Sequence, residues 1–296
     1  MSNEDLPPAV ISWVLHVFQQ CNARIAEKLV NNPNVPEESL DLTWIEHLSR
    51  YSSPIALGNS WFAKIQAHYL GGMRHFYRWE IADIGVLVFL KRAGEMRRSK
   101  VGLLQSKRLY PASQKVAEET LVDYETGFAR LADPEDWSRS IATETMFEFN
   151  DECRYGALLA ASNQVKAIKQ YERKSRLQVY YQLYNPPALP LTRFVPSEHI
   201  TINEVGIGTR IVAASQVHKT LATLKSGESP SLKLLAKTAG GVESLGWPLE
   251  RFVLEMLECR EGSSFAALDD DRIQSMFFRR TGAIAAAIAI TIEGPQ

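Results

Sequence analysis

Apolar positions near the N-terminus repeat with the period of a helix. From Val10 to Ile25 they recur at steps of three and four, which predicts an amphipathic helix over 8–30. A second helix is predicted to begin near Asp41 or Thr43, because Thr43 and Glu46 have capping-box spacing and apolar residues follow them.

A change of pattern after residue 78 indicates a β-hairpin. Residues 79–92 are rich in Ile, Val and Phe, Lys91 to Glu95 form a turn, and 101–107 make the returning strand. Residues 283–292 fit a helix or a strand, and their Ile-Ala-Ile-Thr-Ile ending favours a strand. Further predicted elements are strands at 178–184, 199–203 and 210–214 and helices at 111–131, 158–177, 216–224 and 248–259. A helix and a strand after a hairpin predict an α/β fold with a mixed central sheet flanked by helices.

Composition narrows the class of protein without naming a function. The chain has 296 residues, 45% of them apolar and 23% charged, with a net charge of -1, as expected of a globular protein and not of a disordered one. The longest apolar run, Ala283 to Ile292, is too short to span a membrane. An acidic N-terminus and three scattered cysteines lead us to expect a reducing, cytoplasmic compartment.

Three polar side chains lie inside the apolar hairpin. Asp83 stands on the first strand, and Gln105 and Lys107 share one face of the second, because side chains two apart point the same way. Charged groups in apolar strands are costly unless they are paired or bind a metal. A carboxylate, an amide oxygen and an ammonium are therefore expected to converge across neighbouring strands.

An Asp-x-Gly strand followed by a Gln-x-Lys strand resembles the PD-(D/E)xK nuclease superfamily, in the Mrr-like variant of restriction enzymes. The resemblance covers Asp41 to about Pro187 and departs from the family in having Ala82 where a proline precedes the acid. It implies a restriction-endonuclease-like core at 41–190, with an N-terminal helical extension at 1–40 and a C-terminal α/β extension at 191–296.

The resemblance also implies a catalytic set. Asp83, Gln105 and a helix acid, Glu46, would hold Mg²⁺, with Mn²⁺ as a substitute, and Lys107 would position the attacking water. Glu80 is the alternative acid if a bulge turns it toward Asp83. Glu46 has a second interpretation, as the capping residue of its helix.

Positive charge is concentrated on the hairpin. We expect Arg92, Arg97, Arg98, Lys100 and Arg108 to contact phosphates without reading bases, although such charges can also be a solvated turn. A second basic stretch runs from Lys166 to Arg176 on a later helix.

The resemblance predicts a Mg²⁺-dependent endonuclease acting on double-stranded DNA in restriction or anti-phage defence. A helicase, ATPase or sensor protein is a candidate partner, no membrane is expected, and a homodimer is left open. The competing hypothesis is an inactive nuclease-fold adaptor that binds nucleic acid or a protein. Other chemistries lack support, since the sequence has no dinucleotide fingerprint, phosphate loop, His-x-x-x-His or Cys-x-x-Cys pair, or Gly-x-Ser-x-Gly elbow.

Overall fold

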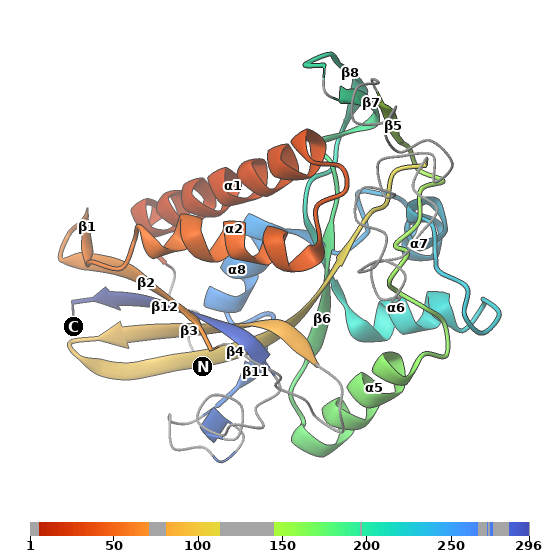
Figure 1. The fold of residues 1–296 in the computed structure, drawn as a ribbon. Helices are drawn as coiled ribbons and strands as arrows, with labels where there is room; N and C mark the ends of the chain where they lie inside the picture. The colour runs from red at the N-terminus through yellow and green to blue at the C-terminus, as the bar shows by residue number, and fades with distance from the viewer. Residues whose placement is uncertain are drawn as a thin grey trace.

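The computed structural model of the protein (Figure 1) describes residues 6–70, 81–112, 145–195, 197–265, 271, 273–274 and 284–295, and for 204–205 only the backbone. Glu80 and nearly all of the helix predicted at 111–131 lie outside these residues.

Most of the helices begin directly after a proline or a serine. Pro7 precedes the first helix and Pro36 the second, while Ser162 and Ser231 cap two later ones through their hydroxyls. Within the described ranges the helices are α1 (Pro8–Asn31), α2 (Glu37–Ser49), α5 (Asn163–Ser175), α6 (Ala214–Leu221), α7 (Leu232–Ala239) and α8 (Leu249–Leu257). None of them is long and apolar enough to cross a membrane.

The strands form one large sheet and one small one. The large sheet contains β1 (Ile55–Gly58), β2 (Trp61–Tyr69), β3 (Ala82–Arg92), β4 (Glu95–Arg108), β6 (Val179–Tyr184), β9 (Arg210–Ala213), β10 (Trp247–Pro248), β11 (Ser263–Ser264) and β12 (Ile284–Gly294). The small sheet contains β5 (Thr145–Phe149), β7 (Ala188–Val195) and β8 (Ile200–Gly206).

The large sheet is mixed, as predicted. Its order is β1-β2-β12-β3-β4-β6-β9-β10, with β11 also paired to β4. The pairs β12–β3 and β4–β6 are parallel, and the other pairs are antiparallel. The predicted hairpin is β3–β4, and its turn uses Ala93 and Gly94 at positive φ, the conformation that tight hairpins require.

The C-terminal strand belongs to the centre of the sheet. The preference for a strand at 283–292 is confirmed by β12, which lies between β2 and β3 and whose isoleucines are buried. The nuclease resemblance implied that this segment belongs to a C-terminal extension packed on the core. The structure instead inserts it into the core sheet, and the expected boundaries at 40/41 and 190/191 fall inside α2 and β7.

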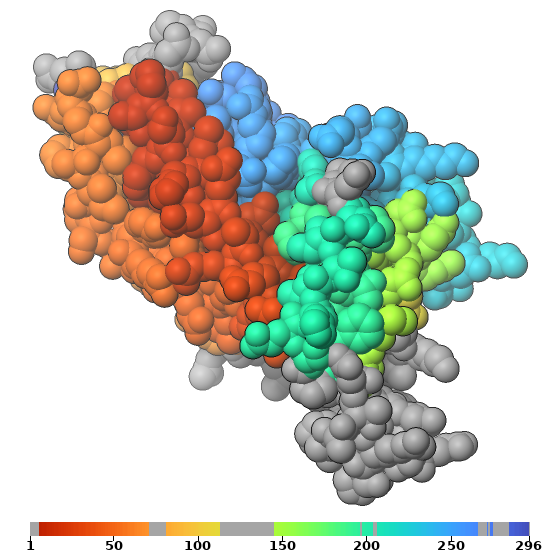
Figure 2. Space-filling model, turned by 90° about the horizontal axis from the view of Figure 1, so that it is seen from above, coloured from red at the N-terminus to blue at the C-terminus, as the bar shows by residue number. Residues whose placement is uncertain are grey.

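Helices cover both faces of the sheet beside β4 and β6. Adjacent residues of a strand point to opposite faces, so Tyr180 of β6 packs against Phe252 of α8 while Tyr181 meets His218 of α6. α1 packs against α2 and α8, and the two N-terminal helices form one continuous surface in the space-filling view (Figure 2). The site described below lies between α2 and the sheet.

His218 is a buried histidine in the contact between α6 and β6. Its Nε2 lies 3.2 Å from the hydroxyl of Tyr181, and only 6% of the residue is exposed. Burial, helped by the charge of Lys169, lowers the pKa of His218 to about 4. The folded protein therefore holds this imidazole in its neutral form.

We expect acid to weaken folding through this residue. Because the pKa of His218 is about 4 in the folded state and about 6.5 in an unfolded chain, its contribution is complete above pH 6.5 and is lost as the pH falls toward 4. The loss between pH 7 and pH 5 is about 2 kcal/mol of unfolding free energy. Urea unfolding at both pH values should show a pH dependence smaller by this amount in His218→Gln than in wild type. His199→Gln, at an exposed position, is the control, and equal pH dependence in all three proteins would refute the assignment.

Candidate functional site

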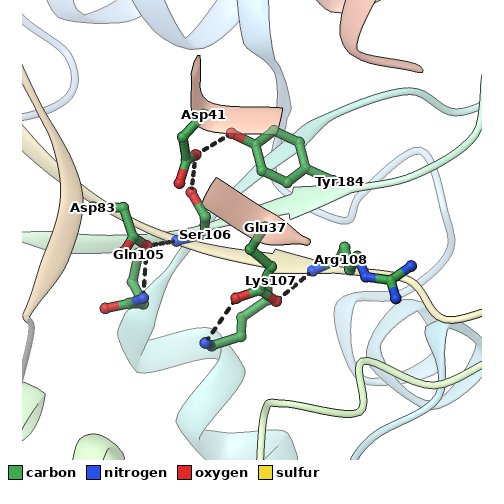
Figure 3. Close-up of polar contacts among 8 residues, drawn as sticks. All are labelled: Glu37, Asp41, Asp83, Gln105, Ser106, Lys107, Arg108 and Tyr184. Carbon is green, nitrogen blue, oxygen red and sulfur yellow. Dashed lines mark hydrogen bonds and ion pairs between the residues drawn. The ribbon is translucent and has the colours of Figure 1, made fainter. Parts of the chain in front are cut away.

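Asp83 begins the hairpin that organises the site. Ile84 pairs with Leu104, which puts Asp83, one residue further out, opposite Gln105. Its Oδ2 accepts hydrogen bonds of 2.6 Å from Gln105 Nε2 and 2.6 Å from the backbone N–H of Ser106 (Figure 3). The predicted meeting of Asp83 and Gln105 is therefore observed.

The position of Asp83 follows from the unequal lengths of the two strands. β3 begins at Ala82, whereas β4 continues to Arg108, so the last N–H groups of β4 on this side have no strand partner. On the other side, Leu103 donates to the carbonyl of Gln178, just before β6, and Leu109 donates to the carbonyl of Tyr184, the last residue of β6. Backbone donors near the interior need acceptors, and carboxylates supply them here.

Glu37 supplies the second of these carboxylates. Its Oε1 accepts a 2.9 Å hydrogen bond from the N–H of Arg108, and its Oε2 lies 3.2 Å from Nζ of Lys107. The side chain of Lys107 is only 2% exposed and that of Glu37 13%. The predicted lysine thus stands at the site as a buried cation paired with an acid from α2.

Asp41 lies one turn further along α2 and joins the same cluster. Its Oδ1 accepts a 2.6 Å hydrogen bond from Ser106 Oγ and another from the hydroxyl of Tyr184, which in turn accepts one from Gln182 Nε2. Ser106 therefore touches two carboxylates, through its N–H to Asp83 and through its hydroxyl to Asp41 (Figure 3).

Burial raises the pKa of Asp41 well above its usual range, and the nearby Asp83 carboxylate raises it further. The hydrogen bonds from Ser106 and Tyr184 act in the opposite direction. Two carboxyl groups that share Ser106 in a buried setting therefore favour a bound proton, or a cation, that offsets their charge.

The helix acid differs from the one predicted. α2 begins at Glu37 and not near Asp41 or Thr43, and the Thr43 hydroxyl is in mid-helix, where it donates to the Ser39 carbonyl. Glu46 is exposed, about 140° around the helix from Asp41, so the structure does not bring it into the cluster. Pro36 followed by two acids indicates this earlier start, because a helix N-terminus favours negative charge, and the sequence-based prediction did not use that signal.

Two of the predicted phosphate-binding cations are buried. Lys100 donates from Nζ to the Gly262 carbonyl at 3.0 Å. Arg108 is fully buried, donates to the Pro33 carbonyl at 2.7 Å and lies 4.0 Å over the ring of Tyr110. These side chains hold loops to the sheet, which corrects the expectation that they face a ligand.

The other three cations lie at the far end of the hairpin. Arg92 packs over the ring of Trp61 at 4.2 Å, and Arg97 forms a 3.2 Å ion pair with Glu95, while Arg98 is half-buried. Arg92 is nine residue steps along β3 from Asp83, a distance of about 30 Å. These cations could touch a long ligand only far from Asp83.

The donor atoms at the site suit a hard, oxygen-seeking cation. Oε1 of Gln105 is buried and has no hydrogen-bond partner in the described part of the chain. Rotation of the Gln105 amide by 180° would exchange Oε1 with Nε2 and point Oε1 at the Asp83 carboxylate. Among the described residues no three His, Cys, Asp or Glu side chains form a complete cage.

Tyr184 should stabilise the fold through Asp41. We expect Tyr184→Phe to lower the unfolding free energy by about 1–3 kcal/mol, because it removes a donor from a buried carboxyl group. Tyr69→Phe is the control, since Tyr69 is 65% exposed, and should leave stability unchanged. Urea titrations of the two variants measure the difference. A fully stable Tyr184→Phe would mean that Asp41 does not depend on this hydroxyl.

Comparisons with known proteins leave the family of this chain open. No family model, no curated protein and no solved structure matches it.

Proposed function

We propose that this protein is a metal-dependent nuclease that hydrolyses phosphodiester bonds of double-stranded DNA. The observation that carries the proposal is the cluster of Asp83, Gln105 and Lys107 on two paired strands, with Asp41 joined to Asp83 through Ser106. Helix α2 before the hairpin, and α5 followed by β6 parallel to β4, support the proposal because the nuclease resemblance expects this order. Action in restriction or anti-phage defence, with a helicase, ATPase or sensor as partner, is part of the same proposal.

The acidic residues have a definite task under this proposal. Asp83 and Asp41 would hold Mg²⁺ with help from the Gln105 amide oxygen. The bound ion would supply charge neutralisation for a phosphate and a more acidic water. Ser106 would keep the two carboxylates in register, since it bonds to both of them.

Lys107 would hold the attacking water and face the negative charge that grows on the phosphate. Glu37 pairs with this ammonium and fixes its direction, since its Oε2 lies 3.2 Å from Nζ. The same ion pair also favours the competing hypothesis of an inactive adaptor, because pairing with Glu37 explains the buried lysine without a catalytic role.

A cleavage assay separates the two. The full chain is incubated with supercoiled plasmid, linear duplex, single-stranded DNA and RNA, each with Mg²⁺, Mn²⁺ or EDTA. We expect duplex DNA to be cut with either metal and to stay intact in EDTA. Binding without cleavage in every metal would support the adaptor, and cleavage that persists in EDTA would exclude a metal-dependent enzyme.

A further inference from the structure

Helix α5 carries a stripe of positive charge that the site does not use. Lys166, Lys169, Arg173 and Arg176 are exposed and follow one another at steps of three, four and three. This spacing aligns them on one face of the helix and its C-cap, over about 15 Å. We call these four residues the α5 stripe.

Folding explains only part of the α5 stripe, since Arg173 lies in the last helical turn and donates from Nε to the Lys169 carbonyl at 3.4 Å. Like charges three and four apart repel one another and destabilise a helix. The helix acid, Glu172, is engaged in accepting a hydrogen bond from the N–H of Val179. Within the described residues no ion pair neutralises the stripe, whereas exposed Lys233 and Arg260 have acidic partners.

The opposite face of α5 anchors the helix to the protein. Val165, Ile168 and Tyr171 are buried there, so no apolar surface of α5 is left to enter a lipid bilayer. A membrane-surface helix would need such a face. A purely cationic stripe instead matches a phosphate backbone, of which 15 Å is the axial length of about four base pairs.

The stripe lies on the side of the sheet to which Gln105 points, whereas Ser106, its neighbour in β4, points to Asp41 of α2 on the other side. α5 leads into β6, which lies parallel to β4, and Lys169 is close enough to His218 to lower its pKa. His218 meets Tyr181, which pairs in register with Gln105 and so points to the same face. In Figure 1, α5 lies on the side of β6 away from α1 and α2.

We propose that the α5 stripe binds the phosphate backbone of duplex DNA. This inference rests on the proposed function for its choice of DNA as the ligand. It assigns the DNA-contacting surface to α5 and not to the tip of the β3–β4 hairpin. The contact is to backbone phosphates, so it is independent of base sequence.

The test measures binding without cleavage. A fluorescein-labelled DNA duplex is titrated with the full chain in EDTA at several NaCl concentrations between about 50 and about 200 mM. The variant is Lys166→Ala/Arg173→Ala, and the control is Lys225→Ala/Lys237→Ala, which removes two exposed cations elsewhere. We expect the stripe variant to bind on the order of tenfold more weakly and its slope of log Kd against log salt to fall by about 2, near 1 per lost phosphate contact.

Each outcome decides the inference. Wild-type affinity and slope in the stripe variant, or wild-type protein that fails to bind the duplex, would overturn it. An equal loss of DNA affinity in the control variant would show that any exposed cation contributes equally, and this would also overturn the inference. Loss of binding to anionic vesicles with DNA binding intact would assign the stripe to a membrane surface. The melting temperature should change little in the variant, because the helix propensity of alanine and the relief of repulsion offset the lost contact of Arg173 with the Lys169 carbonyl.

Failure of the inference differs from failure of the proposed function. A protein that binds through the stripe but cuts nothing with Mg²⁺ keeps the inference and loses the nuclease. A protein that cuts, and whose stripe variant binds normally, keeps the nuclease and loses the inference.

Discussion

Asp83→Asn should reduce Mg²⁺-dependent cleavage by about three orders of magnitude, because metal-assisted stabilisation of phosphoryl transfer supplies several kcal/mol. Asparagine keeps the shape of Asp83 and can still accept the hydrogen bond from the N–H of Ser106. The change therefore removes a charge and little else. Single-turnover cleavage of duplex DNA measures the loss, and thermal unfolding verifies that the protein is folded.

Glu46→Gln is the matched control for this experiment. It removes one carboxylate charge from an exposed position of α2, away from the cluster. We expect it to cut at the wild-type rate, which reverses the expectation drawn from the sequence. Normal cleavage by Asp83→Asn would refute the site, and severe loss in Glu46→Gln would restore the original helix acid.

Lys107→Met should be strongly destabilising, by about 3–5 kcal/mol, because it removes the buried ammonium that pairs with the largely buried carboxylate of Glu37. The double variant Lys107→Met/Glu37→Gln should recover most of this loss. Glutamine removes the stranded charge and can still accept the hydrogen bond from the N–H of Arg108. Urea unfolding of the two single variants, the double variant and wild type gives the coupling energy.

Cleavage by the double variant separates the structural from the catalytic role of Lys107. We expect a folded protein without activity, since the ammonium proposed to face the phosphate is gone. Full activity in the folded double variant would leave Lys107 with a structural role alone. Lys233→Met is the control for stability, because its ion pair with Glu152 is exposed and should be worth less than about 1 kcal/mol.

The hairpin was the most predictable part of the site. Strands β3 and β4 are separated by a two-residue turn, so apolar pattern and turn signals were sufficient to predict them. The two strands are adjacent in the chain, and the meeting of Asp83 with Gln105 follows from their register. Strand β2 was missed, although Trp61, Ala63 and Ile65 alternate with more exposed residues as a half-buried strand requires.

The acids on α2 were less predictable because they depend on where a helix begins. A capping-box pattern at Thr43 competed with the weaker signal of Pro36 and two acids, and the later start was chosen. That error of one turn and a half left Glu37 outside the predicted helix and Asp41 at its edge. Both side chains reach β4 from sequence positions about 65 to 70 residues away.

Sequence by itself determined the local features of this protein: an N-terminal amphipathic helix, an apolar hairpin bearing Asp83 and Gln105, and a strand at the C-terminus. These depend on side-chain period and turn chemistry, which act over a few residues. Only the tertiary structure decided that β12 enters the sheet between β2 and β3, and that α2 and Tyr184 complete the polar cluster. Those contacts join segments that are distant in the sequence. Which segments meet depends on how the whole core packs, and a local sequence pattern does not contain that information.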